Sequence, residues 1–250
     1  MPNERLRALL LERGVTPGKL AETVNVDAKT VERWITKGRV PYRTHRFEVA
    51  AFFGVDESYI WPGALGREQV AAVSESEIVG VYPHRWAMPR DTLGHFFSKA
   101  EHEIGVLVYS GMFIAEDAGV LRLFTERARA GVRVRILLGD PDSRNVDERG
   151  ETEGIGGESL AAKVRSSLLL FRPLLGEPGA EIRLHSTVLY NSIYRADEQL
   201  LVNTHIFGTM ASNAPVFHLR KIPGGEMTST YMDSFERVWD GAAPYQGRKP

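Results

Sequence analysis

The chain has 250 residues, 43% of them hydrophobic and 25% charged, which fits a folded protein of one or two domains and excludes a disordered or fibrous one. Its formal net charge of −1 gives little overall attraction for nucleic acid, and the absence of cysteine excludes disulfides, thiolate metal sites and a cysteine nucleophile. No apolar run is long enough to cross a membrane and the first residues do not resemble a signal peptide, so we expect a cytoplasmic protein with no membrane partner.

The charge is divided unevenly along the chain. Residues 1–63 contain 10 Lys/Arg and 8 Asp/Glu, a formal charge of +2, whereas residues 64–250 contain 21 and 24, a charge of −3. Residues 64–77 lack aromatic side chains and alternate Ser with Glu near their end, which is typical of a linker, with a short helix expected at Arg67–Val73. We therefore predict a slightly basic domain at 1–63 and an acidic domain at 78–250.

The first domain shows apolar residues at helical spacing in four to five short segments. Thr16 and Pro17 have the pattern of an N-cap followed by the first helical residue. Asp27 is expected to cap the next helix, which Gly38 ends. Two helices joined by so short a turn predict a helix-turn-helix inside an all-α domain.

The segment Thr16–Pro41, TPGKLAETVNVDAKTVERWITKGRVP, resembles the XRE (Cro/phage repressor) family of DNA-binding domains, and residues 54–62 end as many bacterial members do. The resemblance implies that Ala28, Lys29 and Arg33 meet base edges in the major groove, where Lys29 and Arg33 suit guanine and Ala28 a thymine methyl. The remaining predicted DNA contacts are Thr16, Lys37, Arg39 and Arg43. The family often has Gln or Ser where Lys29 and Ala28 stand, so no operator sequence follows. A helical module whose Lys and Arg are merely solvated is the alternative.

The second domain alternates strand and helix patterns, which predicts an α/β sandwich with a mixed, mostly parallel sheet. The predicted strands are Ile78–Val81, Ile104–Tyr109, Val132–Leu138, Ile182–Leu189, Ile193–Arg195, Leu200–Ile206 and Val216–Leu219. The predicted helices are Asp91–Glu103, Gly119–Ala130, Ser159–Leu175 and Thr228–Trp239. The polar, glycine-rich segment Gly139–Gly157 is expected to be a mobile surface loop.

The segment Arg183–Asn203, RLHSTVLYNSIYRADEQLLVN, resembles the strand–turn–strand that carries the His-x-Lys-x4-Asp motif of the phospholipase D superfamily. Aligning Asp197 with the family's Asp places Tyr190 at the His position and Ser192 at the Lys position. Aligning His185 with the His instead places Thr187 at the Lys position. Because phosphohistidine chemistry needs both an imidazole and a cation, neither alignment predicts a catalytic site. We therefore expect a binding pocket and no enzyme activity.

Candidate ligand-binding residues lie at strand ends and around this hairpin, where open α/β sheets bind ligands. They are Tyr109, Ser110, His185, Tyr190, Asn191, Ser192, Arg195 and His205, with Asp140 and Asp142 nearby and His84, Arg85 and Trp86 at the rim. Arg195 and the histidines suit an anionic or phosphate-bearing ligand. For each residue alone, a satisfied position in the sheet or a surface charge is an equal alternative. No cofactor and no metal site is expected.

Taken together, these patterns predict a transcriptional regulator that binds a two-fold DNA operator as a homodimer. Its second domain would sense a ligand and hold the dimer together. One alternative is a phosphodiesterase or nuclease of the phospholipase D superfamily recruited to DNA by the first domain. Another is a sensor that binds a partner protein in place of a small molecule.

Overall fold

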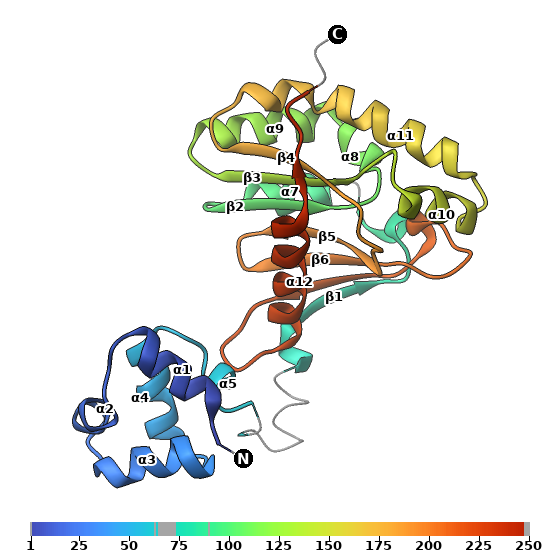
Figure 1. Cartoon of the computed structure of the whole chain (residues 1–250). Helices are drawn as coiled ribbons and strands as arrows, with labels where there is room; N and C mark the ends of the chain where they lie inside the picture. Colours follow the sequence, from blue (N-terminus) through green and yellow to red (C-terminus); the bar gives the residue numbers. More distant parts are fainter. Residues whose placement is uncertain (1, 63, 65–73, 90, 248–250) are drawn as a thin grey trace. The chain divides into compact units, whose positions relative to one another are not determined.

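The computed structural model describes residues 2–62, 64, 74–89 and 91–247 (Figure 1). The chain divides into two compact units, the first formed by Met1–Ser76 with Ile222–Glu226 and the second by Glu77–Lys221 with Met227–Pro250. The grouping of residues 222–226 with the first unit has no counterpart in the sequence pattern. The short helix predicted at Arg67–Val73 lies outside the described residues.

The described part of the first unit is helical. Its helices are α1 (Glu4–Glu12), α2 (Pro17–Thr23), α3 (Ala28–Lys37), α4 (Arg43–Phe53) and α5 (Glu57–Ile60). The Thr16 hydroxyl accepts a hydrogen bond from the Lys19 amide at 3.2 Å, and Asp27 accepts one from the Lys29 amide at 2.8 Å, as their N-cap positions require. Helix α3 ends at Gly38, whose φ of 59° lies in the left-handed region that favours glycine. The predicted all-α character and the caps of α2 and α3 are therefore present.

A single apolar core holds these helices together. Val31, Trp34 and Ile35 of α3 are buried against Leu6 of α1 and Leu20 of α2. Burial of each large side chain contributes on the order of 1.5–3 kcal/mol, so the short helices are held mainly by packing and not by helix propensity. The same packing fixes which face of α3 points outward.

The second unit is built on one mixed sheet, whose described strands lie in the order β1-β7-β6-β5-β2-β3-β4-β8. The strands are β1 (Ile78–Tyr82), β2 (Glu103–Leu107), β3 (Arg133–Gly139), β4 (Ala180–His185), β5 (Asn191–Ala196), β6 (Gln199–Thr204), β7 (Val216–Arg220) and β8 (Ala243–Pro244). Among the described strands, only the β2–β3 and β3–β4 pairs are parallel. The α/β class with a mixed sheet is confirmed.

The prediction of a mostly parallel sheet is wrong, because five of the pairings of described strands are antiparallel. The crossovers from β2 to β3 and from β3 to β4 contain helices and return the chain in the same direction, so these strands pair parallel. From residue 191 to residue 220 the strands follow one another without an intervening α-helix. Consecutive strands joined in this way pair antiparallel, which sets the character of that half of the sheet.

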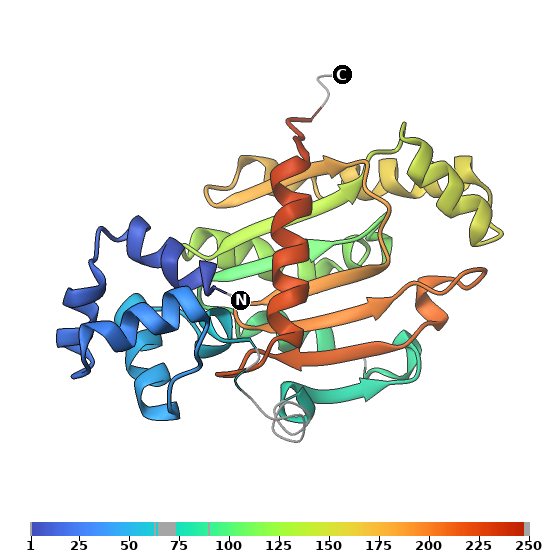
Figure 2. The ribbon, with the colours of Figure 1, turned by 60° about the horizontal axis from the view of Figure 1, so that its bottom comes forward.

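Helices cover both faces of the sheet. Helix α12 (Met227–Gly241) crosses one face, while α7 (Thr92–Ser98), α8 (Met112–Ala115), α9 (Ala118–Arg129) and α11 (Gly157–Leu170) lie on the other (Figures 1 and 2). At Gly105 of β2 an added Cβ would lie 2.9 Å from the Phe235 ring of α12, so glycine permits this close contact. Among the described helices, none is long and apolar enough to span a membrane.

The prediction of a mobile surface loop at Gly139–Gly157 is wrong, because residues Arg144–Thr152 form helix α10. Ser143 caps it by accepting a hydrogen bond from the Val146 amide at 3.3 Å. The glycines that suggested a loop instead allow α10 and α11 to pack closely. A Cβ at Gly150 would collide with the backbone of residues 156–157, and one at Gly157 would collide with Asp147.

A group of ion pairs lies between the sheet and α12. The buried Glu103 carboxylate accepts hydrogen bonds from Arg133 at 2.7 Å and from Arg135 at 3.0 Å, and it also pairs with Arg195 at 3.1 Å. Arg195 and Arg135 contact Glu236 of α12 as well. Hydrogen bonding to Arg135 lowers the pKa of the Glu236 carboxyl despite its partial burial. We call these five residues the α12-side ion network.

Candidate nucleic-acid interface and ligand cavity

The outward face of α3 carries the residues that the sequence predicts to meet DNA. Ala28, Lys29, Arg33 and Lys37 are all exposed, and Glu32 lies among them. In the described part of the chain, no carboxylate lies within ion-pair distance of Lys29, Arg33 or Lys37. Because helix α3 is anchored by its buried side, these cations are presented on a rigid support.

The predicted phosphate contacts lie outside α3. Thr16 is the exposed N-cap of α2, Arg39 follows the end of α3, and Arg43 opens α4. Asn25, with a φ of 49°, turns the chain between α2 and α3. All seven predicted DNA residues are thus exposed on the first unit. Contact with DNA stays a prediction.

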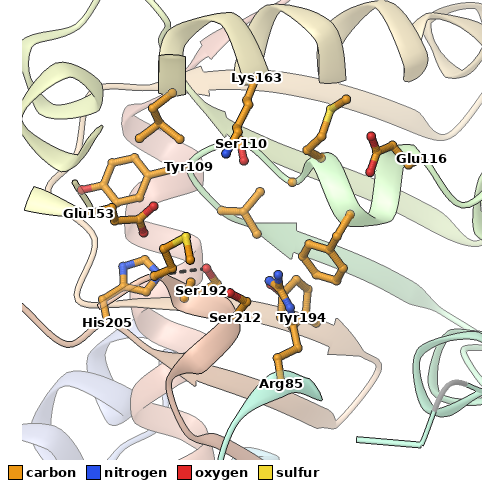
Figure 3. A pocket seen from close by; sticks show the side chains of 17 residues that line it. Arg85, Tyr109, Ser110, Glu116, Glu153, Lys163, Ser192, Tyr194, His205 and Ser212 are labelled. Atoms are coloured by element: carbon orange, nitrogen blue, oxygen red, sulfur yellow. Dashed lines mark hydrogen bonds between the residues drawn. The ribbon is translucent and has the colours of Figure 1, made fainter. Parts of the chain in front are cut away.

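A cavity of about 320 Å³ opens in the second unit beside the ends of β2 and β5 (Figure 3). Its walls combine apolar side chains, among them Val108, Met112, Phe113 and Leu160, with hydroxyl and charged groups. The described elements that supply it are β5, α8, α11 and the short helices η1 (Arg85–Ala87) and η3 (Ala211–Asn213), together with the segments that follow β2, α10 and β6. A volume of this size is at the lower end for a small-molecule site.

Ser192 and His205 form the central polar contact of the cavity. The Ser192 Oγ lies 3.0 Å from the His205 Nε2, and the His205 Nδ1 lies 3.1 Å from the Leu189 carbonyl oxygen (Figure 3). A carbonyl oxygen only accepts hydrogen bonds, so Nδ1 carries the imidazole proton and Nε2 accepts from the serine hydroxyl. Burial lowers the pKa of His205 to about 4, and the positive charge of Arg149 adds to this effect. His205 is therefore neutral near pH 7.

Tyr109 packs against His205, and His185 packs against Tyr109. The Tyr109 ring stacks on His205 with ring centres 5.7 Å apart, and its hydroxyl accepts a hydrogen bond from the Leu189 amide at 3.0 Å. His185 is buried, with Nε2 3.1 Å from the Val108 carbonyl oxygen and Nδ1 accepting from the Thr187 amide. Burial lowers the pKa of His185 and raises that of Tyr109. Both groups are satisfied within the protein and fix the loop that follows β4.

Arg85 and Tyr194 stand on the other side of Ser192 (Figure 3). The Arg85 guanidinium lies 3.8 Å from the centre of the Phe113 ring, a favourable cation–π distance. Tyr194 follows Ser192 by two residues on β5, so both side chains point to the same face of the sheet. Burial raises the pKa of the Tyr194 hydroxyl, although Arg85 and Ser192 oppose this shift. The Tyr194 hydroxyl therefore stays protonated at neutral pH.

The charged residues of the cavity wall are of both signs. Lys163 of α11 and Arg85 are cationic, whereas Glu116 and Glu153 are anionic. Glu153 is paired with Arg149 at 2.6 Å. The cavity thus has no strong surplus of positive charge, and it gives the predicted anionic ligand less support than the sequence did.

Four of the eight predicted ligand-binding residues line the cavity, namely Tyr109, Ser110, Ser192 and His205. His185 lies behind Tyr109 and does not reach it, and Asn191 is absent from its wall. The prediction that Arg195 binds the ligand is wrong, because Arg195 belongs to the α12-side ion network. Successive residues of a strand alternate between faces, so Ser192 and Arg195 point to opposite sides of β5.

Tyr190 lines a second hollow of about 320 Å³, which shares Tyr109 and His205 with the cavity. Its side chain is 80% exposed. The Asp140 and Asp142 pair lies elsewhere, with Asp142 bound to Arg165 at 3.0 Å. His84 and Trp86 are exposed, and of the predicted rim only Arg85 faces the cavity.

Asp197 lies at the turn between β5 and β6. Its carboxylate accepts hydrogen bonds from the backbone amides of Glu101, His102 and Glu103 at 2.7–2.8 Å. Burial alone would raise its pKa, but these three bonds lower it. Asp197 therefore joins the hairpin to the start of β2.

Known proteins resemble this chain in backbone fold. No family model and no curated protein matches the sequence. Among solved structures, TrmBL2, "an archaeal chromatin protein" that "shows a novel mode of DNA binding", matches at 17% identity with a TM-score of 0.43, over 71% of this chain and 59% of that one. A phospholipase D family member, Nuc from Salmonella typhimurium, matches at 15% identity with a TM-score of 0.39, over 67% and 96%. This chain thus spans less than two thirds of the TrmBL2 chain.

Sequence reasoning did not find Lys163, Tyr194 or Ser212, which also line the cavity. The signal for Tyr194 was available, since it shares strand periodicity with Ser192. Lys163 and Ser212 come from α11 and η3, which are distant from β5 in sequence. No local pattern brings such segments together.

Proposed function

We propose that this chain is a sequence-specific DNA-binding regulator that acts as a homodimer and senses a small ligand through its α/β unit. The observation that carries the proposal is the exposed α3 face, on which Lys29, Arg33 and Lys37 have no carboxylate partner in the described part of the chain. A helix with one buried side and one cationic side has the character needed to enter the major groove of DNA.

Dimerisation is proposed on geometric grounds. A helix of ten residues such as α3 reaches only a few base pairs, which is too little for selectivity. Two copies bound to half-sites one helical turn apart would double the recognised sequence. The first domain has a formal charge of only +2, so nonspecific attraction to DNA is weak and affinity depends on paired base contacts.

The α/β unit is proposed to bind its ligand in the cavity beside Ser192 and His205. A cavity with apolar walls and a few converging polar groups is the usual form of a small-molecule site. We do not propose the phosphodiesterase reaction of the phospholipase D superfamily. One alignment puts Tyr190 and Ser192 at the His and Lys positions and the other puts His185 and Thr187 there, so neither supplies both His and Lys. Ligand binding would bias the spacing of the two DNA-binding units in a dimer.

The DNA-binding role is tested by selecting duplexes from a randomised library with the full chain. We expect enriched duplexes with two-fold symmetry. On the best duplex, Arg33→Ala should lose on the order of 1–3 kcal/mol of binding free energy by fluorescence anisotropy, and much less on a scrambled duplex. The matched control is Arg7→Ala, because Arg7 is an Arg of α1 paired with Glu4 at 2.9 Å. This control should bind like the wild type.

Several outcomes would reject parts of this proposal. No enrichment would remove DNA binding altogether. Equal losses for Arg33→Ala on selected and scrambled duplexes would remove the base-reading role. Enrichment of asymmetric single sites would remove the two-fold operator, and cleavage of the bound duplex would favour a recruited nuclease.

A further inference from the structure

The Ser192–His205 contact has the geometry of an activated nucleophile. The serine hydroxyl lies 3.0 Å from Nε2, and the Leu189 carbonyl oxygen 3.1 Å from Nδ1 holds the ring in the tautomer that leaves Nε2 free to accept a proton. A nucleophile, a base and a third group that orients the base are the parts that covalent catalysis requires. We infer that Ser192 is a nucleophile activated by His205 and that the cavity hydrolyses a small carboxylic ester.

This inference goes beyond the proposed function, in which the cavity only binds its ligand. It also involves different chemistry from the phospholipase D motif, because the nucleophile is a hydroxyl and the reacting centre is a carbonyl carbon. The lack of the His and Lys of that motif does not affect ester hydrolysis, since the Ser192 hydroxyl itself supplies the reacting atom. Ester hydrolysis and DNA binding are therefore tested independently.

The structure places hydrogen-bond donors on the side of Ser192 opposite His205. The Tyr194 hydroxyl is buried and makes no hydrogen bond of normal geometry in the described part of the chain. The Arg85 guanidinium stands beside it over the Phe113 ring (Figure 3). A buried donor without a hydrogen bond of normal geometry is costly unless a ligand completes it. A negatively charged oxygen formed during attack on an ester would accept from Tyr194 and Arg85.

The reaction balances within these groups and one water molecule. The Ser192 Oγ forms a bond to the ester carbonyl carbon while its proton moves to the His205 Nε2, and the carbonyl π electrons move to the oxygen. When this intermediate collapses, the bond to the alcohol oxygen breaks and Nε2 returns the proton to the leaving alcohol. Water then attacks the acyl-serine in the same way, which releases the acid and restores Ser192.

The cavity restricts the substrate class. Its volume of about 320 Å³ suits a small ester, and Val108, Met112 and Leu160 offer apolar surface for a short acyl chain. The wall has cations at Arg85 and Lys163 and carboxylates at Glu116 and Glu153, so charge does not select an ionic substrate. A neutral ester of a short-chain acid fits these features best.

The environment of His205 predicts the pH dependence. Tyr109 stacks on its ring, and Arg149 of α10, itself paired with Glu153, places a positive charge near it. Burial and this charge lower the pKa of His205 to about 4. A base of this kind remains unprotonated down to acid pH but is weak, so turnover should be slow. Activity should rise as the pH increases through about 4 and be level above about pH 6.

The test uses the full chain with two probes, diisopropyl fluorophosphate and 4-nitrophenyl acetate. We expect a covalent phosphoryl adduct on the Ser192 peptide by mass spectrometry, together with hydrolysis of the acetate. Ser192→Ala should abolish both, and His205→Gln should slow both by about 100-fold or more. The control is Ser159→Ala, because Ser159 is an exposed serine of α11 and lies outside the wall of the cavity. It should react like the wild type.

A second variant keeps the test decisive where Ser192→Ala fails to fold. Ser192→Cys introduces the only thiol of the chain, since the natural sequence has none. Iodoacetamide should alkylate it faster than it alkylates the thiol of Ser212→Cys, and adding His205→Gln should remove the difference. No adduct at residue 192, an adduct elsewhere, or unchanged hydrolysis in Ser192→Ala would overturn the inference. None of these results bears on DNA binding by Arg33.

Discussion

Strand β5 separates two polar surfaces that differ in how their hydrogen-bonding groups are satisfied. On the α12 side, Arg195 joins the α12-side ion network and pairs with Glu103 and Glu236. On the cavity side, the Tyr194 hydroxyl lies near Arg85 and Ser192 without a hydrogen bond of normal geometry among the described residues, and His205 is held neutral. The polar groups on the α12 side therefore stabilise the fold, whereas those on the cavity side keep hydrogen-bonding capacity that a ligand would complete.

Removal of the central carboxylate of the α12-side ion network should have the largest effect on stability. Glu103→Ala leaves Arg135 and Arg195 with Glu236 alone, in a partly buried site. Breaking a buried pair by removing one partner typically costs about 3–5 kcal/mol. We expect a loss of that order in the free energy of unfolding, measured with urea. Glu126→Ala, which removes an exposed partner of Arg122, is the control and should change stability by less than about 0.5 kcal/mol.

The next largest effect is a loss of folding stability at acid pH through His205. His205 has an ordinary pKa of 6.5 when unfolded and about 4 when folded, so the unfolded chain binds more protons between these values. The stability that His205 contributes is therefore complete above about pH 6.5 and is lost as the pH falls towards about 4, by up to about 3 kcal/mol. Urea unfolding at pH 7.5 and 4.5 should show a steeper fall for the wild type than for His205→Gln. Parallel curves would show that His205 ionises in the fold as it does in water.

The smallest effect on stability is expected on the cavity side, at Ser192. Ser192→Ala removes one hydrogen bond to His205, but the open cavity lets water reach the imidazole. A single hydrogen bond contributes about 0.5–1.5 kcal/mol, so the melting temperature should fall by a few degrees at most. A loss near that of Glu103→Ala would instead assign Ser192 to the structural group. DNA binding should be unchanged.

The sequence predicted features that depend on neighbouring residues. The caps at Thr16 and Asp27 and the end of α3 at Gly38 need only a few adjacent side chains, and all are present. The proportion of parallel strands was wrong because strand pairing is decided by contacts distant in sequence. Helix α10 was missed because Gly150 and Gly157 suggested a loop, whereas they serve helix packing.

The candidate site was partly predictable in the same sense. In the β5–β6 hairpin Ser192 pairs with Asn203, so His205, two residues beyond, is its diagonal neighbour. The hairpin register would therefore have joined Ser192 with His205. Arg85 was predicted at the rim, but the approach of Lys163 could not be predicted, because α11 reaches the cavity through the tertiary fold.

The two close-packed glycines of the α10–α11 pair have a consequence for the chemistry of the cavity. They fix α10, and α10 carries Arg149, whose charge helps to keep His205 unprotonated. Neither glycine touches the imidazole, yet a methyl group at either position would displace the helix that sets its acidity. Gly150 and Gly157 thus determine the basicity of His205 from a distance, and substitutions at these positions would change the pKa of His205 without contacting it.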